Sequence, residues 1–166
     1  MTGRNESGLA ERVRIVQMTS EFAAEMTTWR YPPPYRSYDL IGADPAYFTD
    51  PANGFRALVN DEGALLGFRS FGLDGRVPGG AYDDSALDTG GGLRPDLTGL
   101  GRGLGRQAIA TGLAYGREHF CPAAFRVTVA AFNTRARRVV ESLGFEYVST
   151  FNATTDGAEY NIFVLR

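Results

Sequence analysis

Apolar and polar residues follow two periods along the chain, one typical of strands and one of helices. The apolar-rich runs at 54–59 and 64–71 flank the polar segment Asn60–Gly63, and this arrangement predicts an antiparallel hairpin. Further strands are predicted at 13–16, 86–93, 125–131, 145–151 and 159–165. A loop rich in Gly, Pro and Asp covers residues 73–84, and a polar turn at 152–157 separates the last two strands.

Helical spacing predicts one long helix over Arg102–Phe120 and another that Asn133 caps and Gly144 ends. An earlier helix is expected from Thr19 or Ser20 to Thr28, with short helical stretches at 37–41 and 45–48. The prolines within 29–35 exclude a regular helix there. Together the elements predict a mixed α+β sheet with helices on both faces, in one domain over residues 11–166 after a flexible leader at 1–10.

Composition narrows the class of protein. The 166 residues are 43% hydrophobic and 22% charged, as in an ordinary globular domain. A formal net charge of −2 argues against a nucleic-acid partner, which needs a concentrated basic surface. No apolar run approaches the ~20 residues of a membrane span. Cys121 is the single cysteine, so no internal disulfide can form, and a cytoplasmic location is expected.

The densest group of the 21 glycines lies between Gly90 and Gly105, between a predicted strand and the long helix. A helix start has unpaired N–H groups and the positive end of the helix dipole, so it attracts anions. Glycines in the turn Gly99–Gly105 would let a pyrophosphate lie against the backbone, and Arg102 and Arg106 would add positive charge.

Three other interpretations of this turn compete. A Walker loop requires Gly-Lys-Ser/Thr, which is absent. The run 103–108 matches a dinucleotide fingerprint, but Val127–Ala130 stand where that fingerprint needs an acidic residue. A merely flexible strand–helix connection is the third, because an isolated glycine pattern is weak evidence. A nicotinamide oxidoreductase is therefore disfavoured, and the downstream residues decide among the rest.

Read together with Asn133, Ala136, Gly144 and Phe145, the turn resembles the GNAT superfamily of acetyl-CoA-dependent N-acetyltransferases. The resemblance is specific over 87–145. It implies a V-shaped split between two central parallel strands, where the pantetheine arm of acetyl-CoA inserts. It also implies a set of cofactor contacts, made by the strand backbone at Gly92, Leu93 and Arg94, by the turn residues Gly99, Gly101, Arg102, Gly103, Leu104, Gly105 and Arg106, and by Asn133.

Two positions depart from the family pattern. The leading Arg or Gln of the turn is Thr98 in one register and Leu100 in the other. The helix position that often carries a tyrosine, proposed in the family to protonate the departing thiolate, is Val140. Tyr147, Ser142 or water would then have to serve as the acid.

Acetyl transfer also needs a base for the amine, and Asp88 on the strand before the turn is the candidate. A hydrogen-bonded structural carboxylate is the alternative interpretation of Asp88. Trp29, Tyr31 and Tyr35, with Tyr38, cluster around the proline run and either line the acceptor pocket or form a hydrophobic lid. Aromatic walls suit a cationic amine.

The resemblance therefore implies acetyl transfer from acetyl-CoA to a primary amine by direct attack in a ternary complex. The acceptor is a small molecule or a peptide, and a homodimer is common in the family. The alternative is a non-catalytic acyl-CoA-binding regulatory domain of the same fold. No metal is expected.

Overall fold

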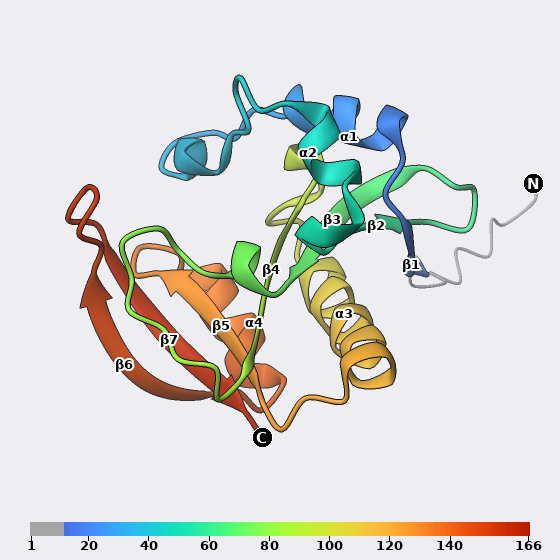
Figure 1. Cartoon of the computed structure of the whole chain (residues 1–166). Helices are drawn as coiled ribbons and strands as arrows, with labels where there is room; N and C mark the ends of the chain where they lie inside the picture. Colours follow the sequence, from blue (N-terminus) through green and yellow to red (C-terminus); the bar gives the residue numbers. More distant parts are fainter. Residues whose placement is uncertain (1–11) are drawn as a thin grey trace, which may run out of the picture.

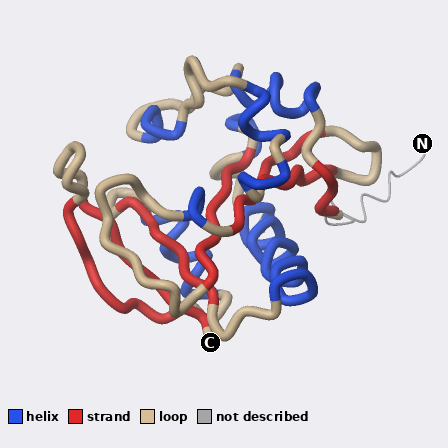
Figure 2. Tube along the Cα trace, viewed as in Figure 1, coloured by secondary structure: helices blue, strands red, loops and turns tan. Residues whose placement is uncertain are grey.

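A computed structural model describes residues 12–166 of the chain as a seven-stranded mixed sheet with helices packed against it (Figures 1 and 2). The strand order is β1-β2-β3-β4-β5-β7-β6. The strands are β1 Arg14–Gln17, β2 Phe55–Val59, β3 Leu65–Phe71, β4 Leu87–Leu93, β5 Phe125–Ala130, β6 Glu146–Asn152 and β7 Glu159–Leu165. The helices are α1 Ser20–Thr27, α2 Pro45–Thr49, α3 Leu104–Phe120 and α4 Thr134–Ser142, with short 3₁₀ turns at η1 Tyr35–Tyr38, η2 Pro51–Asn53, η3 Leu73–Gly75 and η4 Pro95–Leu97.

The two halves of the sheet meet at β4 and β5, which run parallel but pair over only two residues. The paired residues are Leu87 with Phe125 and Asp88 with Arg126. Beyond them β4 continues beside β3 as far as Leu93, whereas β5 continues beside β7. The strands therefore diverge from Thr89 onward, and the expected V-shaped split is confirmed.

Each half of the sheet has its own apolar core, on opposite faces. On one face α1 and α2 cover the N-terminal half, with Met26, Trp29 and Phe48 among the buried side chains. On the other face α3 and α4 cover β5, where Leu113 and Val140 pack with β-branched and aromatic residues. Helices on both faces were expected from the sequence, and the structure confirms them.

Most predicted elements lie where the pattern places them, and the differences have local causes. The long helix begins at Leu104 instead of Arg102, because Gly103 is left-handed with φ 72° and occupies the N-cap position. The helical stretch expected at 37–41 is a 3₁₀ turn at Tyr35–Tyr38, directly after Pro32–Pro34. The expected leader at 1–10 lies outside the described residues.

The described range, residues 12–166, lacks two kinds of structural feature. Within that range, no helix is both long and apolar enough to cross a bilayer. The same range contains no group of three His, Cys, Asp or Glu side chains arranged to hold a metal ion.

Candidate cofactor cleft and acceptor site

The glycine-rich turn leads from the end of β4 into α3 and presents its backbone to solvent. Gly99, Gly101 and Gly103 all have φ near +70°, a conformation that other residues rarely adopt. A side chain at Gly101 or Gly103 would meet nothing within 4 Å, so both positions border open space. The first intrahelical bond runs from Gln107 N to Gly103 O, which leaves the preceding amides free to bind an anion.

Backbone groups of β4 alternate between β3 and the split. Gly72 N donates to Asp88 O, and Arg94 N donates to Leu66 O, so the even-numbered residues face β3. Antiparallel pairing alternates in this way along the strand. Thr89, Gly91 and Leu93 therefore direct their N–H and C=O groups toward the split.

The backbone contacts expected at Gly92, Leu93 and Arg94 need correction for this reason. Of the three, Leu93 faces the split, whereas Gly92 and Arg94 face β3. Even the carbonyl of Leu93 already accepts a hydrogen bond from Tyr31 Oη at 2.6 Å. The sequence interpretation missed Gly91, because strand pairing decides which alternate residues are free.

Asn133 caps α4 beside the split. Its Oδ1 accepts from Ala136 N at 3.1 Å, which is the expected N-cap bond. Its Nδ2 donates to Tyr38 Oη at 3.1 Å, so η1 reaches across to the start of α4. Asn133 thus holds its capping role while its amide group points toward the aromatic segment.

Arg135, the second residue of α4, contacts both the glycine turn and η1. Its guanidinium lies against Gly99 of the turn. Its Nε donates to Tyr35 Oη at 3.0 Å, and its charge lies 4.3 Å from the Tyr35 ring centroid. By contrast Arg102 is exposed, and Arg106 Nε donates to Ser142 Oγ at 3.3 Å.

Of the aromatic residues near the proline run, Tyr35 and Tyr38 lie beside the start of α4, whereas Trp29 lies in the apolar core. Tyr35 and Tyr38 stack, and both rings pack against Phe132, which leads into α4. Burial raises the pKa of Tyr31 and Tyr38 above the ordinary value, so neither phenol serves as a base near neutral pH. Trp29 is 6% exposed in the core against Phe68, so a place in the lining of an acceptor pocket does not fit it.

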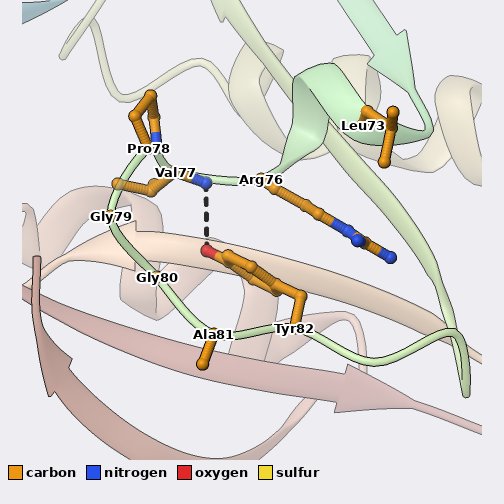
Figure 3. Close-up of a pocket in the computed structure, with 8 residues that line it drawn as sticks. All are labelled: Leu73, Arg76, Val77, Pro78, Gly79, Gly80, Ala81 and Tyr82. Atoms are coloured by element: carbon orange, nitrogen blue, oxygen red, sulfur yellow. Dashed lines mark hydrogen bonds between the residues drawn. The ribbon is translucent and has the colours of Figure 1, made fainter.

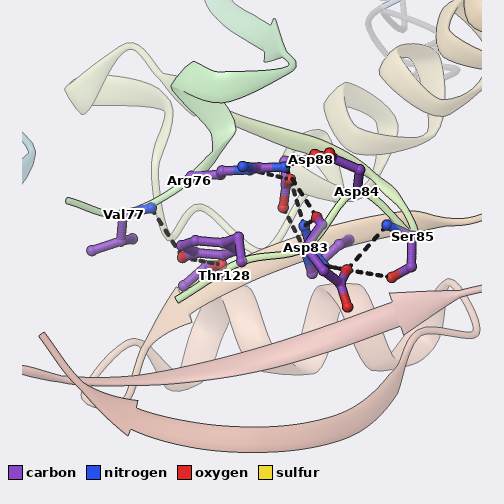
Figure 4. A network of polar contacts seen from close by, with 9 residues as sticks. Arg76, Val77, Asp83, Asp84, Ser85, Asp88 and Thr128 are labelled. Carbon is purple, nitrogen blue, oxygen red and sulfur yellow. Dashed lines mark hydrogen bonds and ion pairs between the residues drawn. The ribbon is translucent and has the colours of Figure 1, made fainter. Parts of the chain in front are cut away.

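Asp88 lies at the narrow end of the split in a network of ion pairs (Figure 4). Arg126 donates from Nε to Oδ1 at 2.7 Å and from Nη2 to Oδ2 at 2.8 Å, and Arg76 Nε donates to Oδ2 at 2.9 Å. The Asp88 side chain is 2% exposed. Three charge-assisted bonds occupy both oxygens, which is the arrangement of a structural carboxylate. The base role expected for Asp88 therefore does not enter the proposed function.

The loop that carries Arg76, after η3, forms an open hollow of about 520 Å³, lined by residues 73 and 76–82 (Figure 3). Tyr82 links this loop to β5, because Val77 N donates to Tyr82 Oη and that oxygen also bonds Thr128 Oγ1 on β5. The loop is tied to the β6–β7 turn, where Thr154 N donates to Gly79 O. The hollow is thus fixed beside the β5 side of the split.

Val140, which stands in place of the usual tyrosine, and the two residues considered for protonating the thiolate, Ser142 and Tyr147, can now be placed. Val140 is 2% exposed within the α4 core. The hydroxyl of Ser142 donates to Val139 O and accepts from Arg106, so its hydrogen-bonding capacity is largely used. Tyr147 lies on β6, which β7 and β5 separate from the split. None has the geometry of a general acid at the split.

A split sheet whose central strand leads through a glycine turn to a helix N-terminus is the architecture of an acyl-CoA-binding transferase. The sequence pattern of the acetyltransferase (GNAT) family matches residues 16–145. The chain therefore belongs to the GNAT family and is an acyl-CoA-dependent N-acyltransferase.

Solved structures agree at the level of the fold. A GNAT acetyltransferase from Bacillus anthracis superposes with a TM-score of 0.69 at 17% identity, covering 94% of this chain and 95% of that one. AAC(6')-Ib with paromomycin and acetyl-CoA gives 0.71 at 17% identity, with 93% of each chain covered. A chimera of the spermidine N-acetyltransferase SpeG from Vibrio cholerae gives 0.65 at 15% identity, covering 93% and 95%. The search of curated protein sequences found no match.

Proposed function

We propose that this enzyme transfers the acetyl group of acetyl-CoA to a primary amine by direct attack within a ternary complex. The observation that carries the proposal is the split between β4 and β5, which opens onto the free amides of the glycine turn. A cofactor with a pyrophosphate and a long, amide-containing arm matches both features. The solved structures with acetyl-CoA or coenzyme A bound support this choice.

The turn is proposed to bind the pyrophosphate. The amides from Gly99 to Gly105 and the α3 dipole attract it, and the side chains of Arg102 and Arg106 add charge. The pantetheine arm would lie along β4 and bond the backbone groups of Gly91 and Leu93, with Asn133 facing it from α4. The N–H of Gly91 is then a donor to the thioester carbonyl, and such donors stabilise the developing oxyanion.

The acceptor is proposed to approach the split from the side away from the glycine turn, between η1 and the loop at residues 73–82. Tyr31, Tyr35 and Tyr38 contribute aromatic walls there, which favour a protonated amine on arrival. AAC(6')-Ib was crystallised with ribostamycin, and SpeG is a spermidine acetyltransferase. A small polyamine or aminosugar is accordingly the acceptor class to test first, with peptide amines second.

Thermal shift and thiol release together test the proposal. Coenzyme A at 100 times its Kd should stabilise the fold by about 2.7 kcal/mol, and NAD should not. Thiol release with a panel of amines then separates an enzyme from a regulatory binding domain. A melting temperature that coenzyme A leaves unchanged would contradict the cofactor assignment, and binding without turnover on any amine would favour the regulatory domain.

Gly105→Asp offers a site-specific variant. A side chain at Gly105 would meet only Leu93 Cδ1, at 3.9 Å, so there is room for it. A carboxylate in the first turn favours the α3 dipole but repels the pyrophosphate, so the free protein should stay folded while coenzyme A binding is lost. Ala114→Asp, at an exposed site on the same helix, is the control and should bind normally. Equal binding by both variants would remove the turn from the phosphate site.

A further inference from the structure

Arg69 is a buried cation with unused hydrogen-bonding capacity. It lies on β3, is 6% exposed, and donates from Nη2 to Thr89 Oγ1 at 3.0 Å. Its Nε is the single buried side-chain nitrogen or oxygen without a hydrogen-bond partner in the described part of the chain. Buried polar atoms are almost always paired, so this atom calls for an explanation.

Among the described residues, no acidic side chain forms an ion pair with Arg69. Above it lies Gly112 of α3, and Arg56 of β2, which pairs with Arg69 in the sheet, is also cationic and lies over the Tyr115 ring. The carboxylate of Asp88 belongs to the opposite face, because it alternates with Thr89 along β4. Burial lowers the pKa of Arg69 to about 10, which shows how poorly its charge is solvated.

The guanidinium of Arg69 lies across β4 at the narrow end of the split. Arg69 pairs with Gly91, and a Cβ atom on Gly91 would come within 2.7 Å of Arg69 Nη1. The glycine therefore leaves the space through which the arginine crosses the strand. Its partner Thr89 is the first residue of β4 past the last contact with β5. The cation is thus held at the apex of the split, not on its outer edge.

The direction of the cofactor arm brings its sulfur toward this apex. The turn that would hold the pyrophosphate follows the outer end of β4, after Leu93. The arm then runs inward along the strand, and the five residues from Leu93 to Thr89 span ~13 Å, in four steps of about 3.3 Å each. The thioester, at the far end of the arm, lies deepest in the split. This step rests on the proposed function.

We propose that Arg69 stabilises the thiolate of coenzyme A as it leaves, at a site where α4 supplies no acidic side chain. In the transfer, the amine nitrogen forms a bond to the thioester carbonyl carbon and the C–S bond breaks. The electron pair of that bond stays on sulfur, and the amine proton passes to water. Val140 has no proton to give, so the sulfur remains anionic until solvent protonates it. A fixed, desolvated guanidinium stabilises this charge and needs no reorganisation during the reaction.

The ionisation of the coenzyme A thiol bound to the enzyme tests the inference directly. Thiolate absorbs in the ultraviolet, so a pH titration of the complex gives the thiol pKa. In the wild-type complex we expect the acid dissociation constant of the coenzyme A thiol to be at least tenfold larger than in free coenzyme A. Arg69→Met should abolish the difference, and Arg69→Lys should retain part of it. Arg56→Met removes a neighbouring cation two strands from the split and is the matched control; it should not change the titration.

Turnover gives a second measurement. Arg69→Met should lower kcat at least tenfold and leave the KM for acetyl-CoA within about threefold, because the charge forms after binding. An unchanged thiol pKa in the wild-type complex overturns the inference, even if Arg69→Met fails to fold. Failure of the wild-type enzyme to bind coenzyme A would instead overturn the proposed function, so the two failures are distinguishable.

Discussion

Asp88→Asn would remove one negative charge from the most buried ion-pair network of the described chain. Asp88→Asn keeps the side-chain shape, but Arg126, which is 7% exposed, loses its bidentate carboxylate partner. Arg76 loses one of its two carboxylate partners and keeps Asp84. Breaking one partner of a buried pair costs about 3–5 kcal/mol. Because Asp83 still bonds Arg126 at 2.9 Å, we expect the low end of this range, about 3 kcal/mol.

Chemical and thermal denaturation would measure this cost. At about 2–4 °C per kcal/mol for a domain of this size, about 3 kcal/mol lowers the melting temperature by about 6–12 °C. Asp84→Asn is the matched control, because Asp84 also pairs with Arg76 but is 99% exposed. Its melting temperature should stay within error of the wild type.

The same variant separates the two interpretations of Asp88. If the carboxylate is structural, Asp88→Asn assayed well below its melting point should keep the wild-type shape of its pH–rate profile. Wild-type stability together with loss of the acidic limb of that profile would refute the structural argument and restore Asp88 as the base.

Three further predictions follow from single contacts. Tyr38→Phe frees Nδ2 of Asn133 and should tighten coenzyme A binding by up to about tenfold in a titration; weaker binding would mean that the phenol contacts the cofactor. Cys121 has φ 45° at the end of α3, so Cys121→Gly should stabilise the fold by about 1 kcal/mol in urea melts, and a loss would refute the strain. Ser85 and then Arg126 lower the pKa of Asp83 to about 2, so between pH 2 and 4 the folded state binds fewer protons than the unfolded state. The stabilisation from Asp83 is complete above about pH 4 and disappears toward pH 2, and Asp83→Asn should flatten that part of an acid titration of stability.

Local sequence determined the elements and the kind of cofactor. Strand and helix periods, the Asn133 cap and the glycines before α3 act through neighbours a few residues away, so the chain order alone reveals them. The spacing of Asn133, Ala136, Gly144 and Phe145 indicated the family for the same reason. The hairpin is confirmed because its signal lies within one short segment, whereas the split was implied by the family resemblance.

Tertiary structure decided what each polar side chain can do. Asp88 meets Arg76 because the loop after η3 folds back over β4, and it meets Arg126 because β5 pairs with β4 there; no local pattern encodes either contact. Trp29 is buried because α1 packs on the sheet. The three consecutive glycines at 90–92 mark the place where Arg69 crosses β4, but the crossing itself depends on strand register. The burial and the partners of these side chains depend on contacts between segments that are distant in the sequence, and the sequence by itself does not reveal those contacts.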